Sequence, residues 1–394
     1  MGLRVFALHC HPRSSLLLHL CTKAKTLAEA KQVHAHMLLT GILRIPSVET
    51  KLLNLYVKCG SLPDARLAFD NMTKGDVFPW NVMIGGYVKH GETREALELY
   101  HQMQKVSSTN PDNYTYSSVL NACARLASLS EGKLIYDEII SKGCEMDVIV
   151  ENALINMFMK CGSIEDARRV FDKMCERNLV SWTAMVSGYA QGGFADEALR
   201  MFYEMQGEDV KANYVTVASV LPACAQLSDL QQGKEIHGYI IRRGLDLGIV
   251  VGNALIDMYA KCGSIGSAQK VFDKMLQRDV VSWNVAIAGY AQNGRFDECM
   301  ELFRKMQCAG LKIDVITWNT LITAYAQNGY GDQTLELFQQ MQLRGVKPNS
   351  ITIASVLSAC AAVSALQEGK RIHDLVNRSE CKSDICVGNA LIDM

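Results

Sequence analysis

The stretch VGNALIDMYAKCGSIGSAQKVFDKMLQRDVVSWN, residues Val251–Asn284, recurs along the chain. Close copies are VENALINMFMKCGSIEDARRVFDKMCERNLVSWT, which starts at Val150, and VETKLLNLYVKCGSLPDARLAFDNMTKGDVFPWN, which starts at Val48. A fourth copy, VGNALIDM, begins at Val387. Self-similarity of this kind predicts an array of stacked repeats rather than a single globular core.

Alignment of equivalent residues divides the chain into repeats of 35, 31 and 35 or 36 residues in rotation. Residues 1–10 precede the array as a candidate remnant of an organellar targeting segment, because the first 28 residues lack Asp and Glu and contain Arg, Ser and Leu. Alternatively, this composition belongs to the first repeat. Eleven repeats and a truncated twelfth follow: 11–45, 46–76, 77–112, 113–147, 148–178, 179–213, 214–248, 249–279, 280–314, 315–349, 350–384 and 385–394.

Each repeat has the pattern of two amphipathic helices. In residues 280–314 the first is VVSWNVAIAGYAQ, which stops at the cap signal Asn293-Gly294, and the second is RFDECMELFRKMQCA, which stops before Gly310. Asp314 then stands where it can cap the next helix. A hairpin of this size cannot bury its apolar stripe alone, so the predicted fold is all-α, a solenoid of tandem helix–turn–helix repeats.

Composition excludes several classes of protein. The formal net charge is −1, which by itself argues against a nucleic-acid ligand, and no apolar run reaches the length of a membrane span. The 14 cysteines include no CxxC, and several recur at fixed repeat positions, which favours buried core thiols over metal ligands. Trp80, Trp182, Trp283 and Trp318 all occupy the fourth position of a repeat, which indicates one structural slot.

Three segments resemble the plant pentatricopeptide repeat (PPR) family, in the class that alternates P, L and S repeats. LPACAQLSDLQQGKEIHGYIIRRG (Leu221–Gly244) is similar to an L repeat, VGNALIDMYAKCGS (Val251–Ser264) to an S repeat and SWNVAIAGYAQNG (Ser282–Gly294) to a P repeat. The resemblance extends from Arg13 to Met394. It implies a right-handed superhelix that binds single-stranded RNA in mitochondrion or chloroplast, with mitochondrion slightly favoured, one base per repeat. In this class the usual task is specifying sites of C-to-U editing.

The chain departs from that family pattern in two places. The array stops inside an S-type repeat without a C-terminal deaminase-like domain, and residues 315–349 form a P-like repeat where an L repeat is due. Zinc deaminases need HxE and a later PCxxC, whereas this chain has a lone His90-Gly91-Glu92 and no CxxC. We therefore expect no catalytic residue, metal or cofactor, and a deaminase or editing-complex protein supplied in trans.

In the family the fifth and last residues of a repeat contact the base. An Asp carboxylate can accept the ring N–H of uracil or guanine, and an Asn amide can donate to adenine or cytosine. The resulting pairs and implied bases are Thr50/Asp76 (G), Asn81/Asp112 (U), Asn152/Asn178 (C or U), Thr183/Asn213 (A), Asn253/Asp279 (U), Asn284/Asp314 (U), Asn319/Asn349 (C or U) and Asn389 (a pyrimidine).

The L-like repeats carry pairs that suit base reading poorly and are interpreted as weak readers or spacers. These pairs are Ser15/Ile45, Ser117/Asp147, Ala218/Gly248 and Ala354/Asp384. The predicted RNA target is then 5′-G-U-n-Y-A-n-U-U-Y-n-Y-3′. The alternative is that Asn, Thr and Asp at these places are ordinary capping residues.

Two further sets of residues fit an RNA interface. Apolar side chains three residues before the fifth position are expected to sandwich bases, or else to belong to the core: Phe78, Ile149, Val180, Val250, Val281 and Ile316. Cations at the thirteenth position are expected to contact phosphates, or else to be solvated charges that favour the helix dipole: Lys23, Lys58, Lys89, Arg125, Lys160 and Lys261.

A protein-binding solenoid of the tetratricopeptide kind is the second candidate. Its repeats are uniformly 34 residues long and contain W-x₂-L-G-x₂-Y, neither of which is found in this chain. This candidate would gain if the fifth side chains pointed into the core.

Overall fold

The computed structural model describes residues 26–72, 75–106, 109–246 and 248–394. These residues contain α-helices and two short 3₁₀-helices, and no strand is found among them. The chain divides into two compact units, Met1–Gly188 and Tyr189–Met394, which are considered separately. The first half of repeat 11–45, with Ser15 and Lys23, lies outside the described residues.

Helices alternate between a first and a second helix of each repeat. The first helices are α3 (Pro46–Lys58), α5 (Val77–His90), α7 (Asn113–Leu126), α9 (Val148–Lys160), α11 (Leu179–Gln191), α13 (Tyr214–Leu227), α15 (Ile249–Lys261), α17 (Val280–Gln292), α19 (Val315–Gln327), α21 (Ser350–Ala362) and α23 (Ile385–Asp393). The second helices are α2 (Leu27–Leu39), α4 (Leu62–Asp70), α6 (Thr93–Gln104), α8 (Leu129–Ser141), α10 (Ile164–Lys173), α12 (Ala195–Gly207), α14 (Leu230–Arg242), α16 (Ile265–Lys274), α18 (Phe296–Cys308), α20 (Gly331–Leu343) and α22 (Leu366–Asn377). The 3₁₀-helices are η1 (Ile42–Arg44) and η2 (Glu380–Ser383).

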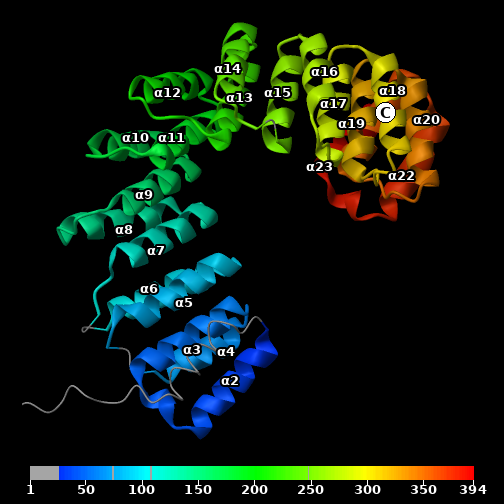
Figure 1. Cartoon of the computed structure of the whole chain (residues 1–394). Coiled ribbons are helices and arrows are strands. Elements are labelled where there is room, and N and C mark those ends of the chain that lie inside the picture. Colours follow the sequence, from blue (N-terminus) through cyan, green and yellow to red (C-terminus); the bar gives the residue numbers. More distant parts are fainter. Residues whose placement is uncertain (1–25, 73–74, 107–108, 247) are drawn as a thin grey trace, which may run out of the picture. The chain divides into compact units, whose positions relative to one another are not determined.

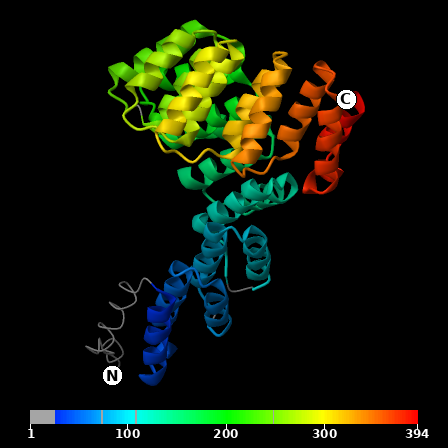
Figure 2. The ribbon, with the colours of Figure 1, turned by 90° about the vertical axis from the view of Figure 1, so that its right-hand side faces the viewer.

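Consecutive hairpins stack side by side within each compact unit (Figures 1 and 2). In the first unit α5 packs against α7 and α7 against α9, while α6 covers both α5 and α7. In the second unit the first helices α13, α15, α17, α19, α21 and α23 form a continuous layer of the same kind. The predicted fold class, an all-α solenoid of helical hairpins, is confirmed.

A tight turn ends the first helix of most repeats. In α15, Cys262 is the C-cap and Gly263 adopts φ of +74°, a left-handed conformation that costs glycine little. The Ser264 N–H then donates to the Tyr259 carbonyl at 2.8 Å, which closes the helix end. This turn explains why Cys-Gly recurs at residues 59–60, 161–162 and 262–263.

The four tryptophans share one packing arrangement, as the repeat positions predict. Each indole ring meets a phenylalanine from the preceding second helix nearly edge-to-face, with ring centroids 4.8–5.2 Å apart: Trp80 on Phe69, Trp182 on Phe171, Trp283 on Phe272 and Trp318 on Phe303. Aromatic pairs of this geometry add about 0.5–1.5 kcal/mol beyond the burial of their area. They fix each first helix against the hairpin before it.

The cysteines differ in exposure, and those that precede glycine at the end of a first helix, Cys59, Cys161 and Cys262, are partly exposed. Cys123, Cys224 and Cys360 are buried, and burial raises the pKa of both Cys123 and Cys224 to about 12, so that their thiols stay protonated. The core interpretation is confirmed for these three. It is wrong for Cys175, Cys308 and Cys386, whose side chains are exposed. Within the described ranges no group of His, Cys, Asp and Glu could hold a metal ion.

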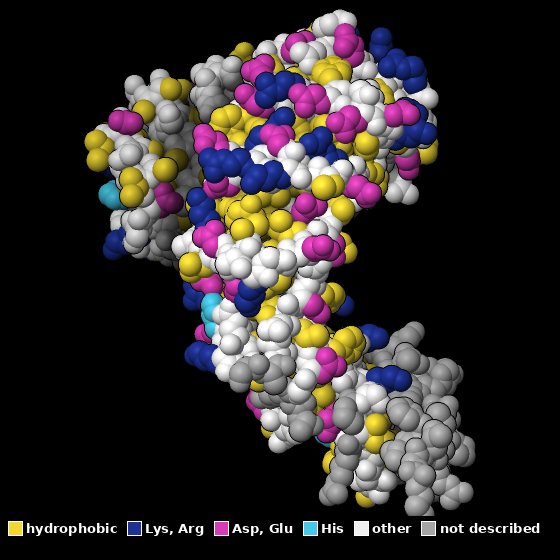
Figure 3. Space-filling view, turned by 90° about the vertical axis from the view of Figure 1, so that its left-hand side faces the viewer, with side chains coloured by type: hydrophobic (Ala, Val, Ile, Leu, Met, Phe, Trp, Pro, Cys, Tyr) yellow, Lys and Arg dark blue, Asp and Glu magenta, His cyan; other side chains and the backbone are white. Residues whose placement is uncertain are grey.

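Charged side chains of both signs are interspersed with apolar ones on the face drawn in Figure 3. This mixture agrees with the formal net charge of −1. Among the described helices, none combines the length and the apolar character needed to cross a membrane.

Truncation of a buried tryptophan tests this packing. We expect Trp318→Ala to lower the free energy of unfolding by about 3–5 kcal/mol, because it removes the ring that packs on Phe303 and leaves a cavity. Val281→Ala removes a side chain that is 55% exposed and should change stability by less than about 0.5 kcal/mol. Urea titration of both variants measures the difference, and equal losses would contradict the assignment of core and surface.

Candidate nucleic-acid interface

The last residue of a repeat begins the first helix of the next repeat. The side chains of Asp112, Asp279 and Asp314 accept the N–H three residues further on at 2.8, 2.8 and 2.9 Å. Asn178, Asn213 and Asn349 do the same at 3.1, 2.9 and 3.1 Å. These six residues are N-caps, as the capping alternative requires, and their positions are thereby fixed relative to the helix axis.

Two fifth-position asparagines contact the last residue of their own repeat. Asn81 on α5 donates from Nδ2 to both carboxylate oxygens of Asp112 at 2.9 Å. Asn319 on α19 donates from Nδ2 to Oδ1 of Asn349 at 3.0 Å. The two residues of each pair are thus brought within hydrogen-bond distance across neighbouring helices. One side chain, such as that of Asp112, can therefore cap the next helix and pair with the fifth residue of its own repeat.

Three other fifth-position asparagines are held differently. The Oδ1 atoms of Asn152, Asn253 and Asn284 are buried and accept no hydrogen bond from the described residues. An amide oxygen in that state costs free energy, of the order of 1–3 kcal/mol. A bound ligand that donates a hydrogen bond to these Oδ1 atoms would therefore recover that free energy.

The remaining fifth-position residues lie on first helices of their repeats. Thr50 lies on α3 and Thr183 on α11, both half-buried, and Asn389 is exposed on α23. In the L-like repeat Asn113–Asp147, the Ser117 hydroxyl donates to the Tyr114 carbonyl of its own helix at 3.0 Å. Ser117 is thereby satisfied locally.

Second-position side chains lie on the surface. The fractional exposure is 54–66% for Phe78, Ile149, Val180, Val250, Val281 and Ile316. The alternative that they belong to the core is therefore wrong. Tyr114 and Ile351, at the same position of two L-like repeats, are 59% and 58% exposed and extend the row. They were missed because only reading repeats were considered.

Five of the six predicted phosphate contacts lie at exposed C-terminal turns of first helices: Lys58, Lys89, Arg125, Lys160 and Lys261. Lys261 makes an ion pair with Asp257 at 2.8 Å, and Arg125 donates to the Val88 carbonyl at 2.5 Å. Both contacts also suit the helix-dipole alternative.

Arg125 and Lys160 line one hollow at the ends of α7 and α9. Its volume is 530 Å³, and Asn121 and Asn156 line it beside the two cations. The hollow therefore offers amide and cationic donors together.

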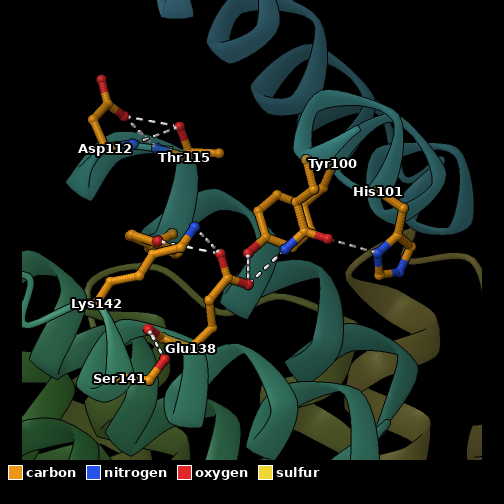
Figure 4. Close-up of polar contacts among 9 residues, drawn as sticks. Tyr100, His101, Asp112, Thr115, Glu138, Ser141 and Lys142 are labelled. Atoms are coloured by element: carbon orange, nitrogen blue, oxygen red, sulfur yellow. Dashed lines mark hydrogen bonds and ion pairs between the residues drawn. The ribbon is translucent and has the colours of Figure 1, made fainter. Parts of the chain in front are cut away.

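A set of buried hydroxyls at the third position was not predicted. Thr115, Ser181, Thr216, Ser282, Thr317 and Thr352 are all fully buried beside the capping residues. At the start of α7, the Thr115 N–H and hydroxyl both lie within hydrogen-bond distance of the Asp112 carboxylate (Figure 4). Figure 4 also shows a separate cluster, in which Glu138 accepts hydrogen bonds from Tyr100 and Lys142. The recurrence of the third-position hydroxyls in the sequence, three residues after each capping residue, was the signal that could have revealed them.

The chain is a solenoid of helical hairpins. Polar side chains pair at the junctions between repeats, and exposed apolar side chains lie beside them. These features place it in the class of α-solenoid repeat proteins. Residues 75–125, 278–317 and 313–362 match the PPR repeat family, and residues 114–144, 152–179, 180–210 and 253–280 match the PPR repeat. These matches together span more than half of the chain. The chain belongs to the pentatricopeptide repeat family.

Known relatives agree with this family. A chloroplastic pentatricopeptide repeat-containing protein of Arabidopsis thaliana is 32% identical over 378 residues, which is 96% of this chain and 40% of that protein. A mitochondrial one from the same plant is 37% identical over 291 residues, 74% of this chain and 46% of that protein. The chain spans less than half the length of these two relatives.

The fold is shared with a solved member of the family. PPR10 in complex with an 18-nt psaJ RNA element superposes with a TM-score of 0.73 at 19% identity, over 96% of this chain and 60% of that chain. PPR10 from maize, in a separate crystal structure, gives 0.65 at 18% identity over the same shares.

Asp76 provides a test of capping separate from any ligand. It begins α5, but the third residue of α5 is Pro79, which has no N–H, and Asp76 makes no side-chain cap. We expect Asp279→Ala to destabilise the first turn of α17 by about 1 kcal/mol and Asp76→Ala to destabilise α5 by less. Amide hydrogen exchange in both first turns measures this. A larger loss at α5 would contradict the assignment.

Proposed function

We propose that this chain binds single-stranded RNA sequence-specifically, one base per repeat. The observation that carries the proposal is the meeting of fifth and last residues, with Asn81 Nδ2 2.9 Å from the Asp112 carboxylate and Asn319 Nδ2 3.0 Å from Asn349 Oδ1. A base edge presented at such a junction meets a donor and an acceptor together. The RNA-bound PPR10 structure of the same fold supports this proposal.

The base at each junction follows from the polar groups there. Asp112, Asp279 and Asp314 can accept the ring N–H of uracil, which gives the U residues of the proposed target 5′-G-U-n-Y-A-n-U-U-Y-n-Y-3′. Thr50 with Asp76 takes G, Thr183 with Asn213 takes A, and asparagine pairs take pyrimidines. The L-like repeats are spacers, because Ala218 and Ala354 have no polar side-chain group.

Stacking and phosphate contacts complete the proposed interface. The exposed second-position side chains, such as Val281 at 55% and Ile316 at 60%, lie three residues before the reading position and can contact a base face. Arg125 and Lys160 are the favoured phosphate contacts, since they line one hollow with two amide side chains. Lys261 forms an ion pair with Asp257 and should therefore contribute less to phosphate binding.

Within the family we assign the chain to the class that alternates P, L and S repeats. The task proposed for it is to specify a site of C-to-U editing, or of RNA processing or stabilisation, in mitochondrion or chloroplast, with the deaminase supplied by another protein. Organellar relatives of both kinds support the compartment. The protein-binding scaffold gains some support from the burial of Asn81 and Asn284, which are 5% and 8% exposed. It is less favoured, because Asn81 and Asn319 hydrogen-bond to the last residue of their repeat instead of only filling core volume.

An RNA-binding assay tests the proposal. Fluorescence anisotropy with the target RNA should give an affinity that falls by about 1–3 kcal/mol when the U facing Asn284 is exchanged for G. Asn284→Thr should reverse this preference, because in the family threonine accompanies purines at this position.

The matched control is the nucleotide facing Ala218, whose exchange should leave the affinity unchanged. Indifference of the wild-type protein to the exchange at Asn284 would rule out base reading. Equal sensitivity at Asn284 and Ala218 would contradict the distinction between readers and spacers.

A further inference from the structure

A buried hydroxyl completes the Asn81–Asp112 pair. Thr115 Oγ1 lies 2.5 Å from Asn81 Oδ1 and 2.9 Å from Asp112 Oδ1. Asp112 Oδ1 already accepts the Thr115 N–H at 2.8 Å and the Asn81 amide at 2.9 Å. A hydroxyl has one proton to donate, and Asn81 Oδ1 is the acceptor with no other donor in the described part of the chain. The Thr115 proton therefore belongs to Asn81.

The same arrangement occurs independently in the other compact unit. Thr352 Oγ1 lies 2.5 Å from Asn319 Oδ1 and 2.9 Å from Asn349 Oδ1. In both networks the asparagine accepts at Oδ1 and donates at Nδ2, so the amide can be held in only one of its two orientations.

Other junctions lack this contact. The hydroxyls of Ser181, Ser282 and Thr317 donate to the capping residue at 3.2, 2.9 and 3.0 Å. The corresponding asparagine oxygens are buried without a partner. The fifth-position asparagine thus occurs in two states, one with Oδ1 bonded to the hydroxyl of the next repeat and one with Oδ1 unpartnered.

The sequence links the third position to the fifth residue of the preceding repeat. Repeats with Asn or Thr at the fifth position are followed by Ser or Thr, with Pro79 after Thr50 as the exception. The L-like repeats are followed by valine at Val48, Val150, Val251 and Val387. Helix capping does not require the hydroxyl, because Asp147 accepts the N–H of Val150 at 2.9 Å. The hydroxyl therefore follows the reading residue rather than the cap.

We propose that Thr115 and Thr352 are positioning residues that set base specificity by fixing the amides of Asn81 and Asn319 with Nδ2 toward the last residue of the repeat. This inference rests on the proposed RNA-binding function. Rotation of the amide would turn Oδ1 toward the side-chain oxygen of Asp112 or Asn349, which brings two acceptors together, and it would break the hydrogen bond that Oδ1 accepts from threonine. Threonine and the last residue of the repeat therefore hold these two amides in one orientation, whereas the amides of Asn253 and Asn284 lack the contact from threonine or serine.

The test compares Thr115→Val with Thr317→Val in RNA binding. Valine matches the shape of threonine, and natural repeats carry valine at this position, so both variants should fold. Thr115→Val leaves Asn81 Oδ1 without a donor and should be the less stable variant, so RNA binding is measured well below both thermal midpoints. We expect Thr115→Val to reduce the preference for U over G at the nucleotide facing Asn81 by about fivefold, the equivalent of one hydrogen bond. Thr317→Val removes a hydroxyl that contacts only the cap and should leave the preference facing Asn284 unchanged.

The outcomes separate this inference from the function on which it rests. A wild-type protein with no preference for U over G at either nucleotide overturns the proposed function. A wild-type protein with that preference, retained in full by Thr115→Val or lost equally in both variants, overturns the positioning role. Thr352→Val should repeat the result at the nucleotide facing Asn319.

Discussion

At most junctions one side chain belongs to two repeats. It is the last residue of one repeat and the N-cap of the next first helix, as Asp279 and Asp314 are through hydrogen bonds of 2.8 and 2.9 Å. The cap fixes the side-chain oxygen at the helix start, where the helix dipole also favours negative charge. The spacing between successive polar junctions is thereby tied to the packing of the first helices.

That packing depends on aromatic contacts within each junction. Trp182 on Phe171 and Trp318 on Phe303 hold a first helix against the preceding hairpin in the same way. The tryptophan is adjacent in sequence to the fifth residue, so the ring that fixes the helix also fixes where the reading side chain emerges. Substitution of either ring would disturb both stability and the placement of the polar pair.

The repeat pattern was sufficient to predict the helices and their caps. The span VVSWNVAIAGYAQ coincides with α17, and Asp314 caps α19 as expected. The pattern could not predict that Asn81 is hydrogen-bonded at both ends of its amide while Asn284 is not, because both asparagines stand at the same position and are followed by the same Asp and Thr at the start of the next helix. The pairing of Lys261 with Asp257 could have been predicted, since the two residues are four apart on one helix and a single turn brings such opposite charges together.

Pro79 has a consequence for the uniformity of the array. Because Pro79 offers no N–H, the Asp76 carboxylate is not anchored by α5 in the way that Asp279 is anchored by α17. Asp279 has lost its rotamer freedom on folding, whereas Asp76 would lose it only when a ligand is bound. Binding a base therefore costs more side-chain entropy at Asp76 than at Asp279. A code based only on residue identity would assign the two carboxylates the same contribution to affinity.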